Sequence, residues 1–404
     1  MAITQLKKPD LKTIINGAAF LGSGGGGSVK SGLQMWDALP DDAVIDVASV
    51  DDATKDVKKY TAMAAYIGSP DSMAAVHKPE GAINAVRVLN TITREPGATE
   101  NLFHLPNNEL DCIGYLVPAE IGALNTVVAC STAYSLKIPV IDADGGGRAV
   151  PQLEMLTFSH TDGLSPSPAI LATPGDEDTA EAMGVHVHTP SRVEHYARTV
   201  ISTADYNSMA GLAMWNMNGT TVSAALPVRG TLELTRAVGQ TLEEGGAEQA
   251  CALLLKADFA RAETIFTGKI IAKETAIGGG FDDGRVILQS VNDKADKLII
   301  YFKNENIIAW RTGMAKPVAF APATIAYSLR KSSSAKGSLG FSNADIEQQG
   351  NDFLLINNQY RNPVVDISII SPHPLLVAAK QYAGIKDAFD NLVLNMGYPL
   401  AQWE

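Results

Sequence analysis

The chain has 404 residues, of which 46% are hydrophobic and 19% are charged, and its formal net charge is −12. This length predicts two or three domains with a large buried core. The acidic balance opposes a basic binding face, so we expect neither nucleic acid nor an anionic membrane as a partner, and we expect any anion to be bound locally.

The first residues, MAITQLKKPD, lack the apolar core of a secretory signal, and no apolar run approaches the roughly 18 residues of a membrane span. We therefore expect a cytoplasmic protein, and a homo-oligomer with a small-molecule substrate. The cysteines are Cys112, Cys130 and Cys251, an odd number without a CxxC pair. This indicates neither a disulfide framework nor a zinc finger, and buried free thiols are the simpler reading.

A glycine-rich stretch, GSGGGG, directly follows residues 10–20, whose apolar side chains have helical spacing. Gly22, Gly24 and Gly27 satisfy GxGxxG, but a dinucleotide fingerprint needs a strand before the loop, and the Lys-Ser/Thr of a Walker motif is missing. Consecutive amides can converge on an anion, and a helix from Ser28 onward would add its positive N-terminus. We expect a small anionic ligand here. Close packing of the loop and a nucleotide phosphate are the alternatives.

Strand-like and helical runs alternate beyond this loop, which predicts a three-layer α/β domain with a mostly parallel or mixed sheet. The expected strands are 43–49, 62–68, 111–117 and 139–144, and the expected helices are 79–93, 123–137 and one that opens at Pro151. Residues 191–259 are expected to be largely helical, with a break near Pro227.

Hairpin-like β runs fill residues 259–372 and are separated by Gly, Asn, Asp and Pro, which predicts a second, β-barrel-like domain. We expect the α/β domain to span 1–258 and to carry both glycine motifs. The final segment, 373–404, returns to helical periodicity and is expected to pack back on the first domain.

The second glycine motif is IPVIDADGGGRAVPQLEMLTF, residues 138–158, where a predicted strand ends in two acids. Asp142 and Asp144 are two residues apart, so both carboxylates leave the same side of the strand. Ligands of open α/β sheets bind beyond the carboxyl ends of the strands. One Asp could act as a base while the other binds a metal or Arg148, or both could hold a divalent ion. The alternative is a turn that caps the next helix and pairs with Arg148 structurally.

Together, GSGGGG and VIDADGGGRAVPQLEMLTF resemble a large bacterial family, long known only as a domain of unknown function, that is tied to S-methyl-thiohydantoin desulfurase and thiohydantoin desulfhydrase. The family usually reads DADGMGRAFPELQM, and this chain departs from that pattern at Gly146, Val150, Gln152 and Glu154. The resemblance extends over essentially the full chain and implies the same two-domain fold.

The resemblance also implies hydrolytic desulfurisation of a thiohydantoin or S-methyl-thiohydantoin ring to the hydantoin, and an association with hydantoinase/oxoprolinase proteins. A non-catalytic subunit of such a system is the alternative, and a nucleotide-binding protein is a weaker one.

Such a reaction needs an activated water, a place for the charge of the tetrahedral intermediate, and a sulfur leaving group. We expect Asp142 or Asp144 to position water or metal, and Arg148 to bind a substrate carboxylate or oxygen. The expected substrate contacts are the amides of Gly24, Gly25, Gly26 and Gly27, together with Ser69, Asp71 and Gly146. Glu120 follows another strand end and is a further catalytic candidate.

Two histidines in GVHVHTP, His186 and His188, are two residues apart on an apparent strand and could project together as metal ligands, with Asp144 as a third. Zinc is then the expected divalent metal. Alternation on a half-exposed strand produces the same spacing without a metal, so this alternative stays open.

Overall fold

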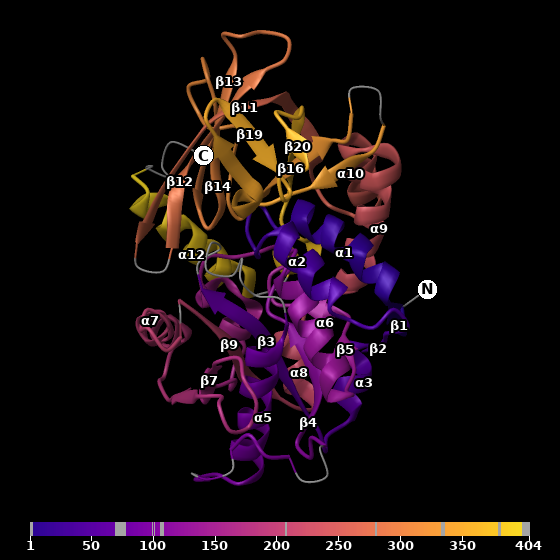
Figure 1. Cartoon of the computed structure of the whole chain (residues 1–404), viewed down its shortest axis with the longest axis vertical. Helices are drawn as coiled ribbons and strands as arrows, with labels where there is room; N and C mark the ends of the chain where they lie inside the picture. Colours follow the sequence, from indigo (N-terminus) through magenta and orange to yellow (C-terminus); the bar gives the residue numbers. More distant parts are fainter. Residues whose placement is uncertain are drawn as a thin grey trace.

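The computed structural model describes residues 3–68, 78–98, 100, 102–105, 109–206, 208–278, 281–332, 336–378 and 381–397. Two large sheets organise them, one drawn from residues 5–217 and the other from residues 262–370. Figure 1 shows the first sheet and its helices in the lower half of the view and the second sheet in the upper half. Helices α1 (Lys8–Leu21) and α2 (Val29–Asp37) lie between them.

The first sheet is mixed, with the strand order β1-β2-β5-β4-β3-β9-β7-β8. Its strands are β1 (Gln5–Lys7), β2 (Val44–Ala48), β3 (Tyr60–Gly68), β4 (Ile113–Pro118), β5 (Val140–Ile141), β7 (Ala169–Ala172), β8 (Ala182–Val185) and β9 (Met209–Met217). Neighbours in the run β2-β5-β4-β3 are parallel, whereas β1, β9, β7 and β8 join antiparallel. The expected α/β class is confirmed.

Helices cover both faces of this sheet, and the side chains of β3 show why. Ala62 and Ala64 pack with α5 (Glu80–Arg94) and α6 (Asn125–Leu136), whereas Met63 and Ala65 belong to the core on the opposite face. That opposite face is covered by α3 (Val50–Lys55), α7 (Pro190–Ile201) and α8 (Thr220–Ala225). A strand buried on both faces is apolar throughout, and this explains the continuous run in the sequence.

Two expectations for this half of the chain are wrong. The segment after Pro151 forms two short 3₁₀ turns, η2 (Leu153–Met155) and η3 (Thr157–His160), because distant acceptors take its backbone donors. The amide of Leu153 donates to Glu194 at 2.9 Å, and that of Thr157 donates to the carbonyl of Gly145 at 2.9 Å. Residues 191–259 also contain strand β9, which pairs on both edges, with β3 and β7.

The second sheet is antiparallel, with the order β15-β14-β13-β12-β11-β21-β16-β17. Its strands are β11 (Ala262–Gly278), β12 (Phe281–Ser290), β13 (Lys297–Lys303), β14 (Glu305–Arg311), β15 (Ala319–Phe320), β16 (Thr324–Arg330), β17 (Ser338–Gly340) and β21 (Val365–Ile370). Although β14 and β15 are far from β16 in the strand order, both contact it, so the sheet curls around its core. This is the expected barrel-like domain in an open form.

Smaller elements complete the two units. A three-stranded sheet joins β18 (Ile346–Gln349), β19 (Asp352–Leu355) and β20 (Tyr360–Arg361), and β6 (Ala143–Asp144) pairs with β10 (Val228–Arg229). The remaining helical segments are α9 (Thr231–Gly245), α10 (Ala247–Lys256), η4 (Asn343–Asp345), α11 (Pro374–Ala378) and α12 (Gln381–Asn395). Helix α12 packs on η2 and η3, and its Phe389 shares a core cluster with Ile307 of β14.

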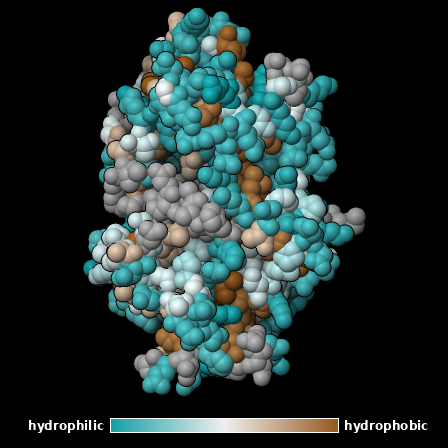
Figure 2. Space-filling view, viewed as in Figure 1, coloured by the Kyte–Doolittle hydropathy of each residue, from teal (hydrophilic) through white to brown (hydrophobic). Residues whose placement is uncertain are grey.

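A continuous hydrophobic cluster joins the two units. Ile15 of α1, Met35 of α2 and Val127 of α6 pack in the same cluster as Phe302 and Tyr327 of the second sheet. Figure 2 shows a mostly hydrophilic face, in which hydrophobic residues appear as narrow strips. Among the described residues, no helix combines the length and the apolar character needed to cross a membrane.

Candidate functional site

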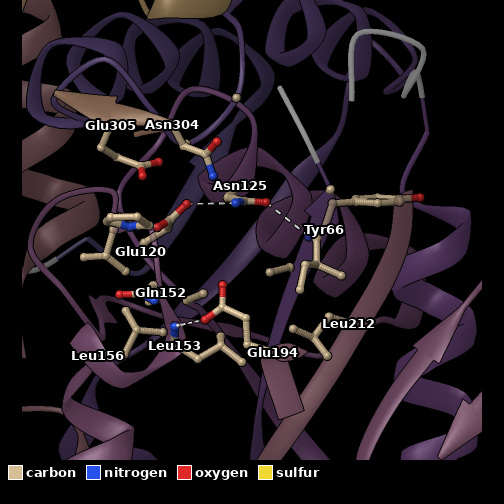
Figure 3. Close-up of a pocket in the computed structure, with 18 of the residues that line it drawn as sticks. Tyr66, Glu120, Asn125, Gln152, Leu153, Leu156, Glu194, Leu212, Asn304 and Glu305 are labelled. Carbon is tan, nitrogen blue, oxygen red and sulfur yellow. Dashed lines mark hydrogen bonds between the residues drawn. The ribbon is translucent and has the colours of Figure 1, made fainter. Parts of the chain in front are cut away.

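A cavity of about 80 Å³ lies where the ends of β3 and β4 face the start of β14. By the volume that one buried water needs, it has room for roughly five to eight water-sized atoms, which suits a small ring. Figure 3 shows the side chains around it. The polar lining comes from Tyr66, Glu120, Asn125, Gln152, Glu194, Arg198, Asn304 and Glu305, and Gly26 and Gly27 of the glycine loop also line it.

Glu120 lies in the cavity wall just beyond β4 and is held by two donors. Its Oε1 accepts from Nδ2 of Asn125 at 2.9 Å, and its Oε2 accepts from the amide of Val150 at 2.8 Å. Burial raises the pKa of Glu120 to about 7, although both hydrogen bonds favour its ionised form. A carboxyl group with such a pKa can take up or release a proton near neutral pH.

Glu305 enters the same cavity from the first position of β14, in the second sheet. It is only 4% exposed, and its Oε2 has no hydrogen-bond partner among the described residues. Burial and the charge of Glu120 raise its pKa well above the usual range, while Arg148 and the amide of Gly26 act in the opposite direction. In Figure 3 the carboxyl groups of Glu305 and Glu120 are neighbours that face the same space.

Like charges this close cannot both be ionised at low cost, so the pair favours a state in which one carboxyl group keeps a proton. The positive charge of Arg148 favours the ionised form of both carboxyl groups and offsets part of their negative charge. Its own pKa is lowered to about 10 by burial, although both carboxylates favour its charged form. The arrangement therefore offers one proton donor and one proton acceptor at the same place.

Asn304, the residue before Glu305, supplies a neutral donor to the cavity. Its backbone is left-handed, with φ of 56°, a conformation that asparagine tolerates better than most residues. Its Oδ1 accepts from the amide of Asp282 at 2.8 Å, which leaves Nδ2 turned toward the cavity in Figure 3. An amide donor beside two carboxyl groups suits a developing oxyanion.

The opposite end of the cavity is formed by Glu194 of α7 and by apolar side chains. Glu194 accepts from Arg198 at 2.6 Å, and burial raises its pKa even so. The guanidinium of Arg198 also lies 3.7 Å from the ring centre of Phe281, at the start of β12. The apolar lining is Met63, Ala65, Ile67, Ala119, Val150, Pro151, Leu153, Leu156 and Leu212.

Carboxylates of the chain itself lie beside the glycine loop and the helix start that follows it, where we expected a small anionic ligand. The amides of Val29 and Lys30, at the start of α2, donate to Asp345 at 3.0 and 3.3 Å. A Cβ on Gly25 would lie 2.0 Å from Oε1 of Glu305, so only glycine leaves room for that carboxylate. Of the four predicted glycines, Gly26 and Gly27 line the cavity, whereas Gly24 packs against Asn306.

The acids of the second glycine motif lie outside the cavity lining. Asp142 accepts from the amide of Leu232 at 2.7 Å, at the start of α9, and burial raises its pKa. Asp144 accepts from the amides of Gly146 and Gly147 at 2.8 and 2.6 Å, and burial raises its pKa to about 7. Both carboxylates thus hold a turn and a helix start.

Arg148 reaches across to the second sheet, where it binds backbone carbonyl groups. It donates to the carbonyls of Ala149 at 2.8 Å, Ala323 at 2.8 Å, Pro322 at 3.2 Å and Asn306 at 3.3 Å. These contacts occupy the guanidinium that we expected to bind a substrate carboxylate. Arg148 therefore acts as a clamp between the two units.

The predicted metal ligands do not come together in a cluster. Strand β8 ends at Val185, so His186 and His188 lie beyond it, and both are exposed. Within the described ranges, no three His, Cys, Asp or Glu side chains gather in a way that could hold a metal ion. A bound zinc ion stays a prediction, but Asp144, His186 and His188 do not form its site, and we derive no chemical step through it. Ser69 and Asp71 lie outside the described residues.

Comparison with known proteins places this chain in a family. A model described as the S-Me-THD-like N-terminal domain matches residues 9–180, and one described as the S-Me-THD-like C-terminal domain matches residues 188–339. The chain belongs to the S-Me-THD-like family. This membership confirms the resemblance seen in the two glycine motifs and supports a thiohydantoin-related function at the level of the family.

A solved structure has a fold similar to that of this chain. The chain is similar to the crystal structure of a protein from Chromobacterium violaceum, a Northeast Structural Genomics Consortium target, with 27% sequence identity and a TM-score of 0.78. The match covers 98% of each chain. No curated protein matches this sequence.

Most of the polar cavity residues carry no recognisable signal in the sequence. Glu120 was expected because it follows a strand end, and the same rule would have reached Asn125 five residues later. Glu194 lies on an amphipathic helix, where an acidic residue is unremarkable in the sequence. Asn304 lies between β13 and β14, and Glu305 begins β14. Only their position in space links these two residues to Glu120.

Proposed function

We propose that this S-Me-THD-like chain is an enzyme that hydrolyses a five-membered thiohydantoin or S-methyl-thiohydantoin ring at C2 and releases the sulfur. The observation that carries the proposal is the buried pair of Glu120 and Glu305 in a cavity of ring size. Family membership supports the class of ring, and the paired carboxyl groups supply the chemistry that the class needs.

In the proposed reaction, the ionised member of the pair takes a proton from a water molecule as the water oxygen bonds to C2. Asn304 donates from Nδ2 to the charge that develops at the ring. The C2–S bond then breaks, and the protonated member of the pair supplies a proton to the leaving sulfur. The proton that remains on the oxygen at C2 passes to the ring nitrogen of the S-methyl ring, or to the sulfide that leaves the thiohydantoin, as the C2 carbonyl forms. The products are the hydantoin, with a carbonyl at C2, and methanethiol or hydrogen sulfide. The pair ends with the same number of protons as it began.

The test is a turnover assay with thiohydantoin and S-methyl-thiohydantoin, in which a thiol reagent detects the released sulfur. Glu120→Gln and Glu305→Gln should each lower kcat by about 10² to 10⁴, the usual contribution of general acid–base catalysis. Glu347→Gln is the matched control, because Glu347 is an exposed glutamate on β18. Wild-type protein that releases no thiol from either ring would overturn the proposal, as would full activity in both cavity variants.

A further inference from the structure

One carboxylate oxygen in the cavity wall has no donor of its own among the described residues. Oε2 of Glu305 is buried without a hydrogen-bond partner among the described residues, although the residue lines the cavity and its carboxyl group faces the space in Figure 3. A buried carboxylate oxygen without a donor is costly. A ligand with N–H groups directed at this oxygen would remove that cost.

The ionisable side chains that line the cavity are mostly acidic. Three glutamates, Glu120, Glu194 and Glu305, line it, and Arg198 is the cation in the described part of the lining. Arg198 is already committed, because it pairs with Glu194 and covers the ring of Phe281. Arg148 is not part of the lining, and its guanidinium donates to backbone carbonyl groups. Glu120 and Glu305 thus face the cavity without a cation on the ligand side.

We propose that this cavity binds five-membered cyclic guanidinium ions, with the N–H edge of the ring cation on the carboxyl groups of Glu120 and Glu305. A guanidinium is planar and matches carboxylate oxygens with two parallel N–H donors, and such charge-assisted bonds are roughly twice as strong as neutral ones. The inference rests on the proposed function only for the size of the ring. The charge requirement comes from the cavity wall.

A matched ligand pair tests this. The cation 2-iminoimidazolidine and the neutral imidazolidin-2-one have the same ring and differ at C2, where one carries a protonated nitrogen and the other an oxygen. Isothermal titration calorimetry on the full chain should show that the cation binds at least about tenfold more tightly, because only the cation gains charge-assisted bonds. Equal affinities, or tighter binding of the neutral ring, would overturn the inference without any variant.

Variants then locate the binding. Glu305→Gln and Glu120→Gln should each reduce the preference for the cation, and Glu347→Gln should leave it unchanged. Circular dichroism confirms that each variant is folded. A preference that survives in both cavity variants would place the cation elsewhere and overturn the inference.

The outcome is separable from that of the desulfurisation assay. Thiol release from S-methyl-thiohydantoin without any binding of 2-iminoimidazolidine would overturn only the cation site. Binding of the cation without thiol release from either thiohydantoin would overturn only the proposed reaction.

Discussion

Asn125 and Glu120 are joined by a hydrogen bond of 2.9 Å that ties the start of α6 to the end of β4. The other end of the Asn125 amide, Oδ1, accepts from the backbone of Tyr66 in β3 at 3.1 Å. A single side chain thus fixes Glu120 against two neighbouring parallel strands. The carboxyl ends of these strands are where ligands of open α/β sheets bind.

Asn125→Leu should move the acidic limb of the kcat/KM profile to higher pH. The Asn125 amide favours the ionised form of Glu120, so its removal raises the pKa of the group that must accept a proton. Asn84→Leu is the control, since Asn84 is also buried but donates to the carbonyls of Thr173 and Gly175, away from the cavity. Both variants should lose about 1–3 kcal/mol of stability. Equal pH profiles for the two would contradict the role of Asn125.

Gly25→Ala should impair both folding stability and turnover. The new Cβ would lie 2.0 Å from Oε1 and 2.4 Å from Cγ of Glu305, so the glutamate must move out of place. We expect a loss of about 1–3 kcal/mol in the free energy of unfolding. Turnover should fall roughly 10- to 100-fold, because the displaced carboxyl group no longer reaches its position.

Gly184→Ala provides the matched control for Gly25→Ala. Of the residues that the structure describes, a Cβ there meets only Ile170, whose Cδ1 lies at an ordinary contact distance of 3.7 Å. Thermal melts and the thiol-release assay compare the two. If Gly25→Ala had the melting temperature and the turnover of the wild type, Glu305 would not need its present position.

Asp144→Asn should change how stability depends on pH while leaving turnover nearly intact, because Asp144 lies outside the cavity lining. The pKa of Asp144 is raised from 3.8 to about 7, so the folded protein keeps this proton after the unfolded chain has lost it. The contribution of the Asp144 proton to the free energy of unfolding is therefore complete below about pH 4, and it is lost as the pH rises to about 7.

Urea unfolding between pH 4 and pH 8 measures this effect. Asparagine can still accept from the amides of Gly146 and Gly147. Relative to the wild type, the free energy of unfolding of Asp144→Asn should therefore rise by about 4 kcal/mol between pH 4 and pH 8. Stability curves that stay parallel would mean that Asp144 is ionised in the folded protein. Abolished turnover in a folded Asp144→Asn protein would instead support its predicted catalytic role.

Arg148→Leu should destabilise the contact between the two units by about 2–5 kcal/mol, because carbonyls such as those of Ala323 and Asn306 would be left buried without a donor. Arg148→Lys should recover only part of this, since an ammonium cannot reach all four carbonyls. Arg285→Leu is the control, because Arg285 pairs with Glu274 on the surface and should matter little. Unfolding midpoints in urea rank the three, and a midpoint for Arg148→Leu equal to that of Arg285→Leu would rule out the clamp.

The two errors in secondary structure have a common physical cause. Residues 209–217 fall within the range 191–259 that we expect to be largely helical, because a short apolar run alone does not distinguish a buried helix from a buried strand. Their strand conformation depends on β3 and β7, which offer free edges on both sides. The turns after Pro151 likewise depend on acceptors such as Glu194, which lies more than forty residues away along the chain.

The sequence alone determined the class of each half of the molecule, the glycine loop after a helix, and Glu120 as a strand-end acid. These features follow from local periodicity and from the rule that ligands bind beyond strand ends. Only the tertiary structure decided which acids share a cavity. In the folded chain Asp142 and Asp144 accept from backbone amides, and Asp345 and Glu305 lie at or beside the glycine loop. Glu305 lines the same cavity as Glu120, although the two are 185 residues apart along the chain. Burial and charge coupling depend on such long-range contacts, and no local pattern encodes them.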